Sequence, residues 1–225
     1  MLEFEVLDHA DTPIGTFILR ERTEPVPGVI ELTLDHQFLM SSTVTVSERA
    51  LSTRAIEMHG GTDLEVMVGG LGLGYTAKAA LDSGRVASVD VVEYVQSIID
   101  WVARGLIPLG KELVADPRYH PIHGDVFERL GGPVEKSYDV LLIDVDHSPD
   151  ERLGETSDSF YGHAKLVLAA KHLKPGGVFA LWSTNESPEF EAELRKTFQE
   201  VHIEPIEFFN ATTDQEEQNW LFLAR

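Results

Sequence analysis

The stretch Val66-Met67-Val68-Gly69-Gly70-Leu71-Gly72-Leu73-Gly74-Tyr75-Thr76 decides the fold that we expect for this chain. An apolar strand runs into a glycine-rich loop, and the pattern predicts that a helix comes next. Glycine is needed where the backbone turns tightly and where a ligand approaches it beside the positive end of a helix. A tight turn alone would also explain the glycines, but their position between a strand and a helix favours a nucleotide or nucleoside site.

Strands and helices alternate downstream of this loop. Apolar runs of this kind suit strands that are covered on both faces of a parallel sheet, and they lie at Leu64–Val68, Val86–Val92, Val140–Ile143 and Val178–Trp182. Helices are predicted at about Thr76–Asp82, Val95–Arg104, Val126–Leu130, Ser159–His172 and Pro188–Phe198.

The end of the chain is expected to complete the sheet. Lys174-Pro175-Gly176-Gly177 should terminate the preceding helix and lead into a strand. Val201–Phe209 and Trp220–Leu223 are expected to add an antiparallel pair of strands. The predicted fold is therefore α/β: a doubly wound, mostly parallel sheet of about seven strands, Rossmann-like, with a small N-terminal β segment.

The chain upstream of residue 60 follows a different pattern. Alternating stretches at Phe4–Leu7, Ile14–Leu19 and Val29–Leu34 are separated by proline and glycine, which predicts a small antiparallel meander. Thr45 and Glu48 form a possible capping box for a helix that would end near Met58. We therefore expect residues 1–60 to form an N-terminal segment and residues 61–225 to form the ligand-binding domain.

The composition limits the partners of the chain. Its 225 residues include 38 acidic residues against 18 lysines and arginines, which gives a formal net charge of −20. No basic window suits nucleic acid or an anionic membrane, whereas a small cationic ligand would be attracted; solubility is the alternative explanation of the charge. Cysteine is absent, which excludes disulfides and thiolate chemistry. With neither a signal-peptide pattern nor a long apolar segment, the expected location is cytoplasmic.

Two carboxylates follow predicted strands at positions that suit a nucleoside. Glu93 ends a strand 23 residues after Gly70, and an acid at about this spacing can accept hydrogen bonds from both ribose hydroxyls. A solvated strand-end carboxylate is the alternative, and Asp90 fits less well because it lies within the strand. Asp125 could accept a hydrogen bond from an adenine amino group, or it could only cap the next helix.

These motifs, together with Asp144-Val145-Asp146 and Lys174-Pro175-Gly176-Gly177, occur in the order seen in spermidine and spermine synthases. The chain resembles this family over roughly Asp63–Trp182. The resemblance implies the class I S-adenosylmethionine methyltransferase fold, with S-adenosylmethionine or its decarboxylated form as cofactor. It also implies a possible homodimer. The implied cofactor-binding residues are Gly69, Gly70, Gly72, Gly74, Glu93, Asp125 and Val126.

The chain departs from the family at the residues that bind amines. Aminopropyltransferases usually have Asp at the position of Gly72, where it contacts the amine of decarboxylated S-adenosylmethionine. Gly72 removes the repulsion that an acid there would exert on the carboxylate of intact S-adenosylmethionine. Ser47–Glu57 lacks the family's Tyr and Asp-Glu pair, and Ala211–Trp220 lacks its substrate-contacting Tyr.

The acidic loop after the fourth strand of the predicted sheet is expected to carry the chemistry. An amine is a nucleophile only when neutral, so a carboxylate must take its proton and orient its lone pair. The resemblance assigns this role to Asp144, supported by Asp146 and His147, although His147 could simply lie in a turn. Tyr161 is the aromatic residue most suited to contact the acceptor.

A metal is not expected in this loop. Asp144 and Asp146 resemble the Mg²⁺ ligands of some O-methyltransferases and could suffice in principle, but Ser183-Thr184-Asn185-Glu186 matches the remaining ligands poorly. The histidines are scattered without zinc-binding spacing. The sequence therefore predicts methyl transfer from S-adenosylmethionine to a small amine or hydroxyl. The alternatives are aminopropyl transfer to a polyamine and nucleoside binding without catalysis.

Overall fold

A seven-stranded sheet forms the centre of the molecule, a computed structural model that describes residues 2–145, 149, 160–210 and 214–225. The strand order is β10-β11-β9-β8-β5-β6-β7. The pairs β10–β11 and β11–β9 are antiparallel, and the pairs β9–β8, β8–β5, β5–β6 and β6–β7 are parallel. The strands are β5 (Leu64–Gly69), β6 (Val86–Glu93), β7 (Tyr119–His123), β8 (Tyr138–Ile143), β9 (Leu173–Ser183), β10 (Val201–Asn210) and β11 (Gln215–Ala224). The predicted doubly wound α/β fold is confirmed.

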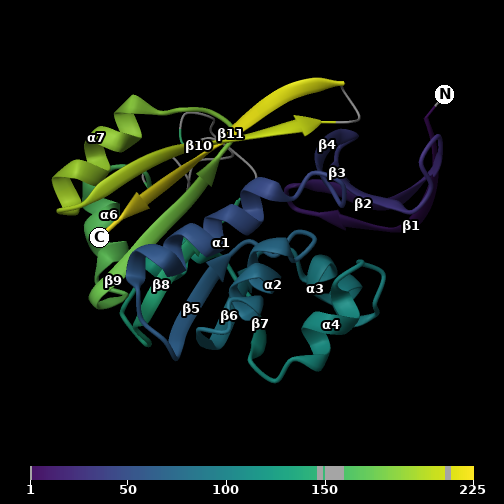
Figure 1. The fold of residues 1–225 in the computed structure, drawn as a ribbon. Helices are drawn as coiled ribbons and strands as arrows, with labels where there is room; N and C mark the ends of the chain where they lie inside the picture. Colours follow the sequence, from purple (N-terminus) through teal and green to yellow (C-terminus); the bar gives the residue numbers. More distant parts are fainter. Residues whose placement is uncertain (1, 146–148, 150–159, 211–213) are drawn as a thin grey trace.

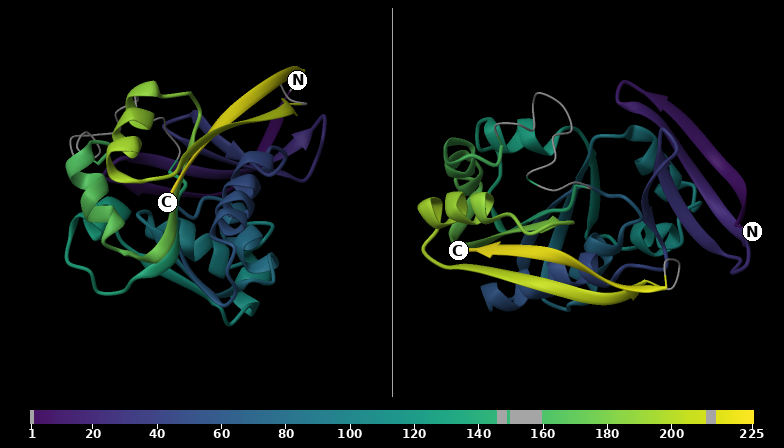
Figure 2. Two further views of the ribbon diagram at one scale, coloured as in Figure 1. Left: turned by 60° about the vertical axis from the view of Figure 1, so that its left-hand side comes forward. Right: turned by 90° about the horizontal axis from the view of Figure 1, so that it is seen from above.

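Helices cover both faces of this sheet (Figures 1 and 2). Val66 and Val68 of β5 belong to one buried cluster and Met67 belongs to the other, as expected when successive side chains alternate across a strand. The first cluster includes residues of α1 (Val46–His59), α2 (Tyr75–Asp82), α3 (Gln96–Ala103) and α4 (Gly110–Ala115). The second includes residues of α5 (Val126–Gly131), α6 (His163–Ala170) and α7 (Pro188–Thr197).

The N-terminal segment is a separate antiparallel sheet of four strands in sequential order, drawn in purple in Figure 1. Its strands are β1 (Glu3–Thr12), β2 (Gly15–Glu24), β3 (Val29–Leu34) and β4 (Gln37–Ser41). Its inner face joins the first buried cluster. Asp8 on β1 also accepts a hydrogen bond of 3.1 Å from the indole nitrogen of Trp101 on α3. The meander is thus confirmed and lies against the larger sheet.

Two local expectations are wrong. The capping box does not form: Thr45 is the N-cap of α1 but makes no side-chain cap, and its Oγ1 accepts from Arg49 instead. The Glu48 carboxylate accepts from Ser47 Oγ at 2.9 Å. The helix predicted at Ser159–His172 is α6, which begins only at His163 and ends at Ala170; Lys174-Pro175-Gly176-Gly177 lies within β9.

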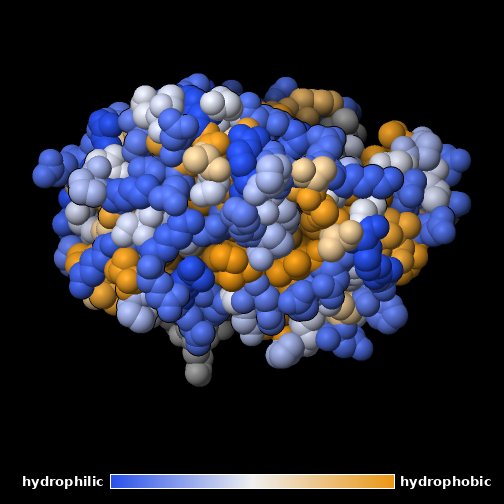
Figure 3. Space-filling model, turned by 90° about the horizontal axis from the view of Figure 1, so that it is seen from below, coloured by the Kyte–Doolittle hydropathy of each residue, from blue (hydrophilic) through white to orange (hydrophobic). Residues whose placement is uncertain are grey.

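Apolar side chains reach the surface in several places. The view from below shows a band of them among charged residues (Figure 3). On the N-terminal sheet, Val6 and Phe38 are each 57% exposed. The homodimer expected from the resemblance stays a prediction. Within the described ranges, no helix has the length and apolar character that a membrane crossing requires.

Candidate functional site

The glycine loop lies at the carboxyl edge of the sheet, between β5 and α2. Gly70 has φ +96°, and a Cβ there would lie 2.0 Å from the backbone oxygen of Asp144. A Cβ on Gly69 would lie 2.6 Å from Val126 Cγ2. These two glycines therefore allow the loop to pack directly against the end of β8 and the start of α5, which brings three candidate elements to one edge.

Glu93 is the last residue of β6 and lies beside this loop. Its carboxylate accepts hydrogen bonds from the backbone nitrogens of Leu71, at 2.8 Å, and Val95, at 2.7 Å, and the residue is 6% exposed. Burial raises the pKa of Glu93, and these backbone donors oppose that change. The backbone groups of Gly72 and Tyr94 also lower its pKa by hydrogen bonding, so backbone donors surround this carboxylate. Its contact with ribose stays a prediction.

Asp90, the alternative carboxylate in the same strand, binds other side chains of the protein. Asp90 accepts from Lys136 Nζ and from the Tyr138 hydroxyl, each at 2.8 Å. Burial and Asp90 together raise the pKa of Tyr138 to about 12. Asp90 therefore ties β6 to β8 inside the sheet, whereas Glu93 lies at its edge.

Asp125 caps α5. Its Oδ1 accepts from the backbone nitrogens of Phe127, at 2.7 Å, and Glu128, at 3.3 Å. Both bonds use Oδ1, so the cap is compatible with a contact between Oδ2 and an adenine amino group. The adjacent Val126 is buried against the glycine loop. The structural alternative for Asp125 is therefore present, and its adenine role stays a prediction.

Asp144 directly follows β8, and its backbone nitrogen donates to Gly69 O at 2.8 Å. Its side chain is part-buried and accepts a hydrogen bond from the Thr76 hydroxyl. Burial raises the pKa of Asp144 to about 6, while the Thr76 hydrogen bond opposes the rise. A carboxyl group with this pKa can take up and release a proton near neutral pH. Asp146 and His147, its expected supporters, lie outside the described residues.

Thr76 is the residue that the sequence analysis missed. It lies in the first turn of α2 and is 3% exposed. Its Oγ1 lies 3.3 Å from the backbone oxygen of Glu48, and its own carbonyl accepts from Ser52 Oγ at 2.7 Å. The signal in the sequence was a hydroxyl residue two positions after the last loop glycine, where an apolar residue would suit the core.

The N-terminal sheet also reaches the site. Gly72 has φ +48°, and a Cβ there would lie 2.6 Å from the sulfur of Met40 at the end of β4. The space beside Gly72 is thus filled by a flexible thioether from a different sheet. The sequence analysis identified the missing acid at this position but not the side chain that takes its place.

Tyr161 lies in an aromatic cluster. Its ring is 5.6 Å from that of Phe160 and 5.5 Å from that of Phe190, both in edge-on geometry. Burial raises the pKa of the Tyr161 hydroxyl. The ring packs in the second buried cluster, and its predicted contact with an acceptor is not needed to explain its position.

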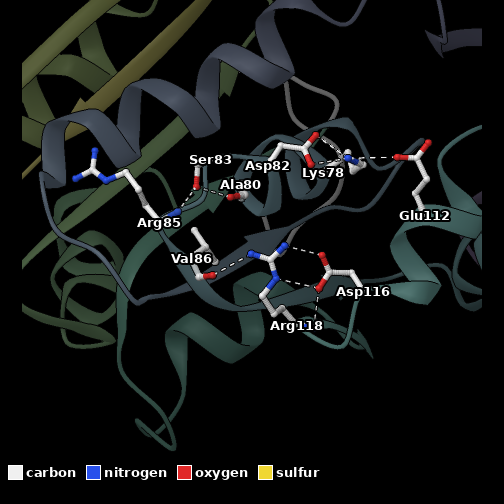
Figure 4. Close-up of polar contacts among 9 residues, drawn as sticks. All are labelled: Lys78, Ala80, Asp82, Ser83, Arg85, Val86, Glu112, Asp116 and Arg118. Atoms are coloured by element: carbon white, nitrogen blue, oxygen red, sulfur yellow. Dashed lines mark hydrogen bonds and ion pairs between the residues drawn. The ribbon is translucent and has the colours of Figure 1, made fainter.

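Acids on the helices beside the sheet differ from those of the candidate site in how they are paired. On α2, on α4 and before β7, Lys78 binds Asp82 at 2.5 Å and Glu112 at 3.3 Å, and Arg118 binds Asp116 at 2.6 Å (Figure 4). At the carboxyl edge, no lysine or arginine of the described residues pairs with Glu93 or Asp144. The acids at the candidate site are thus left to attract a cationic ligand.

A metal site is not evident in the described part of the chain. No group of three or more His, Asp or Glu side chains lies there in an arrangement that could hold an ion. The described residues supply hydrogen-bonding backbone, the carboxylates of Glu93, Asp125 and Asp144, and the Thr76 hydroxyl group at this edge.

Comparison with known proteins relates the chain to one group of enzymes. No protein-family profile matches the chain. A polyamine aminopropyltransferase of Prochlorococcus marinus strain MIT 9313 is 32% identical over 141 residues, 63% of this chain and 44% of that protein. Its counterpart in strain NATL1A is 30% identical over 151 residues, 66% of this chain and 47% of that protein. The chain thus spans less than half the length of these curated relatives.

Solved structures agree on the fold. Spermidine synthase from Thermotoga maritima superposes with a TM-score of 0.76 at 18% identity, covering 97% of this chain and 72% of that one. A spermidine synthase in complex with the transition state analogue AdoDATO gives a TM-score of 0.73 at 16% identity, covering 97% and 71%. The chain therefore has a spermidine synthase-like fold and is similar in sequence to polyamine aminopropyltransferases.

Proposed function

We propose that the chain is a transferase that moves an aminopropyl group from decarboxylated S-adenosylmethionine to a small amine. The observation that carries this proposal is that Asp144 lies at the same sheet edge as the glycine loop and Glu93. A proton acceptor and a nucleoside-binding acid are thus close together. The similarity to polyamine aminopropyltransferases supports aminopropyl transfer over the methyl transfer expected from the sequence.

The residues present fit a nucleoside cofactor with a sulfonium group. The glycine loop packs closely against the end of β8, and the Glu93 carboxylate lies beside it, where ribose hydroxyls would share it with the backbone nitrogens. Oδ2 of Asp125 can accept from adenine, because the cap of α5 uses Oδ1. Bound in this way, the sulfonium supplies a carbon that is already activated for attack.

The chain's own contribution is to orient the acceptor and to take its proton. The neutral amine nitrogen of the acceptor forms a bond to the carbon attached to the sulfonium sulfur. The carbon–sulfur bond breaks with its electron pair going to sulfur, which becomes a neutral thioether. The proton that the amine loses passes to Asp144, whose pKa of about 6 suits that transfer near neutral pH.

Methyl transfer from intact S-adenosylmethionine is a second candidate, favoured by one observation. Position 72 carries no acid, and Met40 fills the space beside it. The described site therefore shows no carboxylate at this point that would repel the carboxylate of intact S-adenosylmethionine. The two candidates share Glu93 and Asp144 and differ in the donor and in the group that it transfers.

The nucleoside product separates the two reactions. The chain is incubated with each donor and a panel of linear diamines, and the products are separated by chromatography. Aminopropyl transfer releases methylthioadenosine from the decarboxylated donor, whereas methyl transfer releases S-adenosylhomocysteine from the intact one. We expect methylthioadenosine.

Calorimetry with both donors and methylthioadenosine provides the binding control. Asp144→Asn is expected to lose at least about 100-fold in turnover while the donor's dissociation constant changes by less than about threefold. If none of the three nucleosides binds, the proposed function is wrong. Turnover with the intact donor alone would replace it by methyl transfer.

A further inference from the structure

We infer that Thr76 is a positioning residue whose hydroxyl group serves both protonation states of Asp144, donating to the carboxylate and accepting from the carboxylic acid. The inference rests on the proposed function, in which Asp144 receives the proton of the acceptor. It assigns α2 a part in the proposed reaction, in addition to that of the glycine loop before it.

The hydroxyl group lies between two oxygen atoms. Thr76 Oγ1 contacts Asp144 Oδ2 on one side and lies 3.3 Å from the backbone oxygen of Glu48 on the other. A hydroxyl has one proton and two lone pairs, so it can donate to only one of these oxygens at a time. With Asp144 ionised, the Thr76 proton points to Oδ2.

Protonation of Asp144 reverses the direction of this hydrogen bond. The new proton on the carboxyl group can be donated to Thr76 Oγ1, and the Thr76 proton then turns to the carbonyl oxygen of Glu48. A backbone carbonyl has two lone pairs, so this oxygen can accept from Thr76 as well as within α1. Both states of Asp144 are then hydrogen-bonded, which avoids leaving a buried polar group without a partner.

The surrounding structure holds the hydroxyl in this position. Thr76 is 3% exposed, and its carbonyl accepts from Ser52 Oγ at 2.7 Å, which ties α2 to α1. A β-branched side chain has few χ1 rotamers in a helix. The Asp144 backbone is fixed by its hydrogen bond to Gly69 O. The donor and the acceptor are therefore both positioned by backbone contacts.

The charged surroundings leave Thr76 as the group that lowers the pKa of Asp144. The adjoining elements carry titratable side chains, among them Glu48 and Arg49 on α1, Tyr75 and Lys78 on α2 and Glu93 on β6, but none of these shifts the pKa of Asp144. Burial raises the pKa of Asp144 and the Thr76 hydrogen bond opposes it. Without the Thr76 hydroxyl, nothing would oppose the effect of burial on the pKa of Asp144, so that pKa would rise. A larger fraction of Asp144 would then be protonated at neutral pH and unable to accept a proton.

The test is the titration of Asp144 in full-length chain labelled with ¹³C at aspartate Cγ. Asp144→Asn identifies the signal by its loss. In Thr76→Val the pKa of Asp144 is expected to rise by about one or more, whereas in Thr76→Ser it should stay within about 0.3 of the unmodified chain. The acid limb of kcat/KM against pH is expected to move with it in Thr76→Val and to return in Thr76→Ser.

Several outcomes would overturn the inference. An unchanged Asp144 titration in Thr76→Val does so, as does an equal rise in Thr76→Ser. Thr76→Ala serves as the hydroxyl-free variant if Thr76→Val does not fold. The titration needs no substrate, so a chain that transfers nothing but shows the expected titration would refute the proposed function and leave the hydrogen-bond arrangement standing.

Discussion

At the scale of single residues, Glu93 shows how backbone nitrogens hold the carboxylate that we propose binds ribose. Its two oxygens accept from backbone nitrogens of the glycine loop and of the segment that precedes α3. Burial raises the pKa of Glu93 because it disfavours the charged form, and the backbone donors lower that pKa because they stabilise the carboxylate. The same side chain therefore closes the loop at the point where we propose that ribose binds.

Glu93→Gln tests this double role. An amide has only one acceptor oxygen, so one backbone nitrogen loses its partner, which costs about 1–3 kcal/mol of unfolding free energy. Donor affinity by calorimetry is expected to fall at least about tenfold, because two ribose contacts weaken as well. Asp90→Asn, in the same strand, is the control: it should lower stability without changing affinity. Equal affinity in Glu93→Gln would contradict the assignment.

At the scale of elements, the glycine loop holds neighbouring strands together in addition to its proposed part in ligand binding. A side chain at position 70 would meet backbone, which cannot turn aside, and one at position 69 would meet the branched Val126. The loop therefore fixes the distance between the end of β5 and the end of β8, and with it the position of Asp144.

Comparing Gly70→Ala with Gly84→Ala separates the effect of the contact with the Asp144 backbone from the general strain of a positive φ. Gly84 also has positive φ, +68°, but a Cβ there meets nothing within 4 Å. We expect Gly84→Ala to lower the unfolding free energy by about 1–2 kcal/mol and Gly70→Ala by at least about 3 kcal/mol, since the end of β8 must move. Denaturant titration measures both unfolding free energies. Equal losses in the two variants would show that the structure accommodates a Cβ beside the Asp144 backbone without further destabilisation.

At the scale of the whole molecule, one buried cluster crosses the boundary expected at residue 60. Leu19 and Leu32 of the N-terminal sheet belong to the same cluster as Val66 and Val68 of β5. The division into residues 1–60 and 61–225 stays a prediction about organisation. The shared core indicates that the two sheets stabilise each other.

Leu32→Ala is therefore expected to destabilise both sheets together. Leu32 is 3% exposed, and its truncation should cost about 2–5 kcal/mol while the chain still unfolds in one calorimetric transition. Val6→Ala, at a position 57% exposed, is the control with little change expected. If Leu32→Ala splits the transition in two, with the second at its original temperature, the sheets fold independently.

Much of the fold could be predicted because its strands are covered on both faces. Continuous apolar runs such as Leu64–Val68 leave few other structures open, and the glycine loop marks the turn from β5 into α2. Glu93 and Asp144 could be located for a related reason, since carboxyl ends of neighbouring parallel strands share one edge.

The features that could not be predicted depend on contacts between distant segments. The strand β4 comes after a turn in which Asp35 and His36 both have positive φ, at +47° and +69°, without the glycine that marks such turns. The hydroxyl of Thr76 has its partner only in the folded chain, where β8 places Asp144, 68 positions further along the sequence, beside it. Such pairings are set by tertiary packing, which no local pattern records.

The contact between Gly72 and Met40 has a consequence for how this site can diversify over evolutionary time. Position 72 lies in the left-handed region that Asp and Asn tolerate best, and its neighbour is the movable end of a methionine. Position 70, by contrast, faces immovable backbone. An acid could therefore be gained or lost at position 72 with little disturbance of the scaffold. Under the proposed function, such an exchange at position 72 would alter the donor preference while the rest of the loop stays constant.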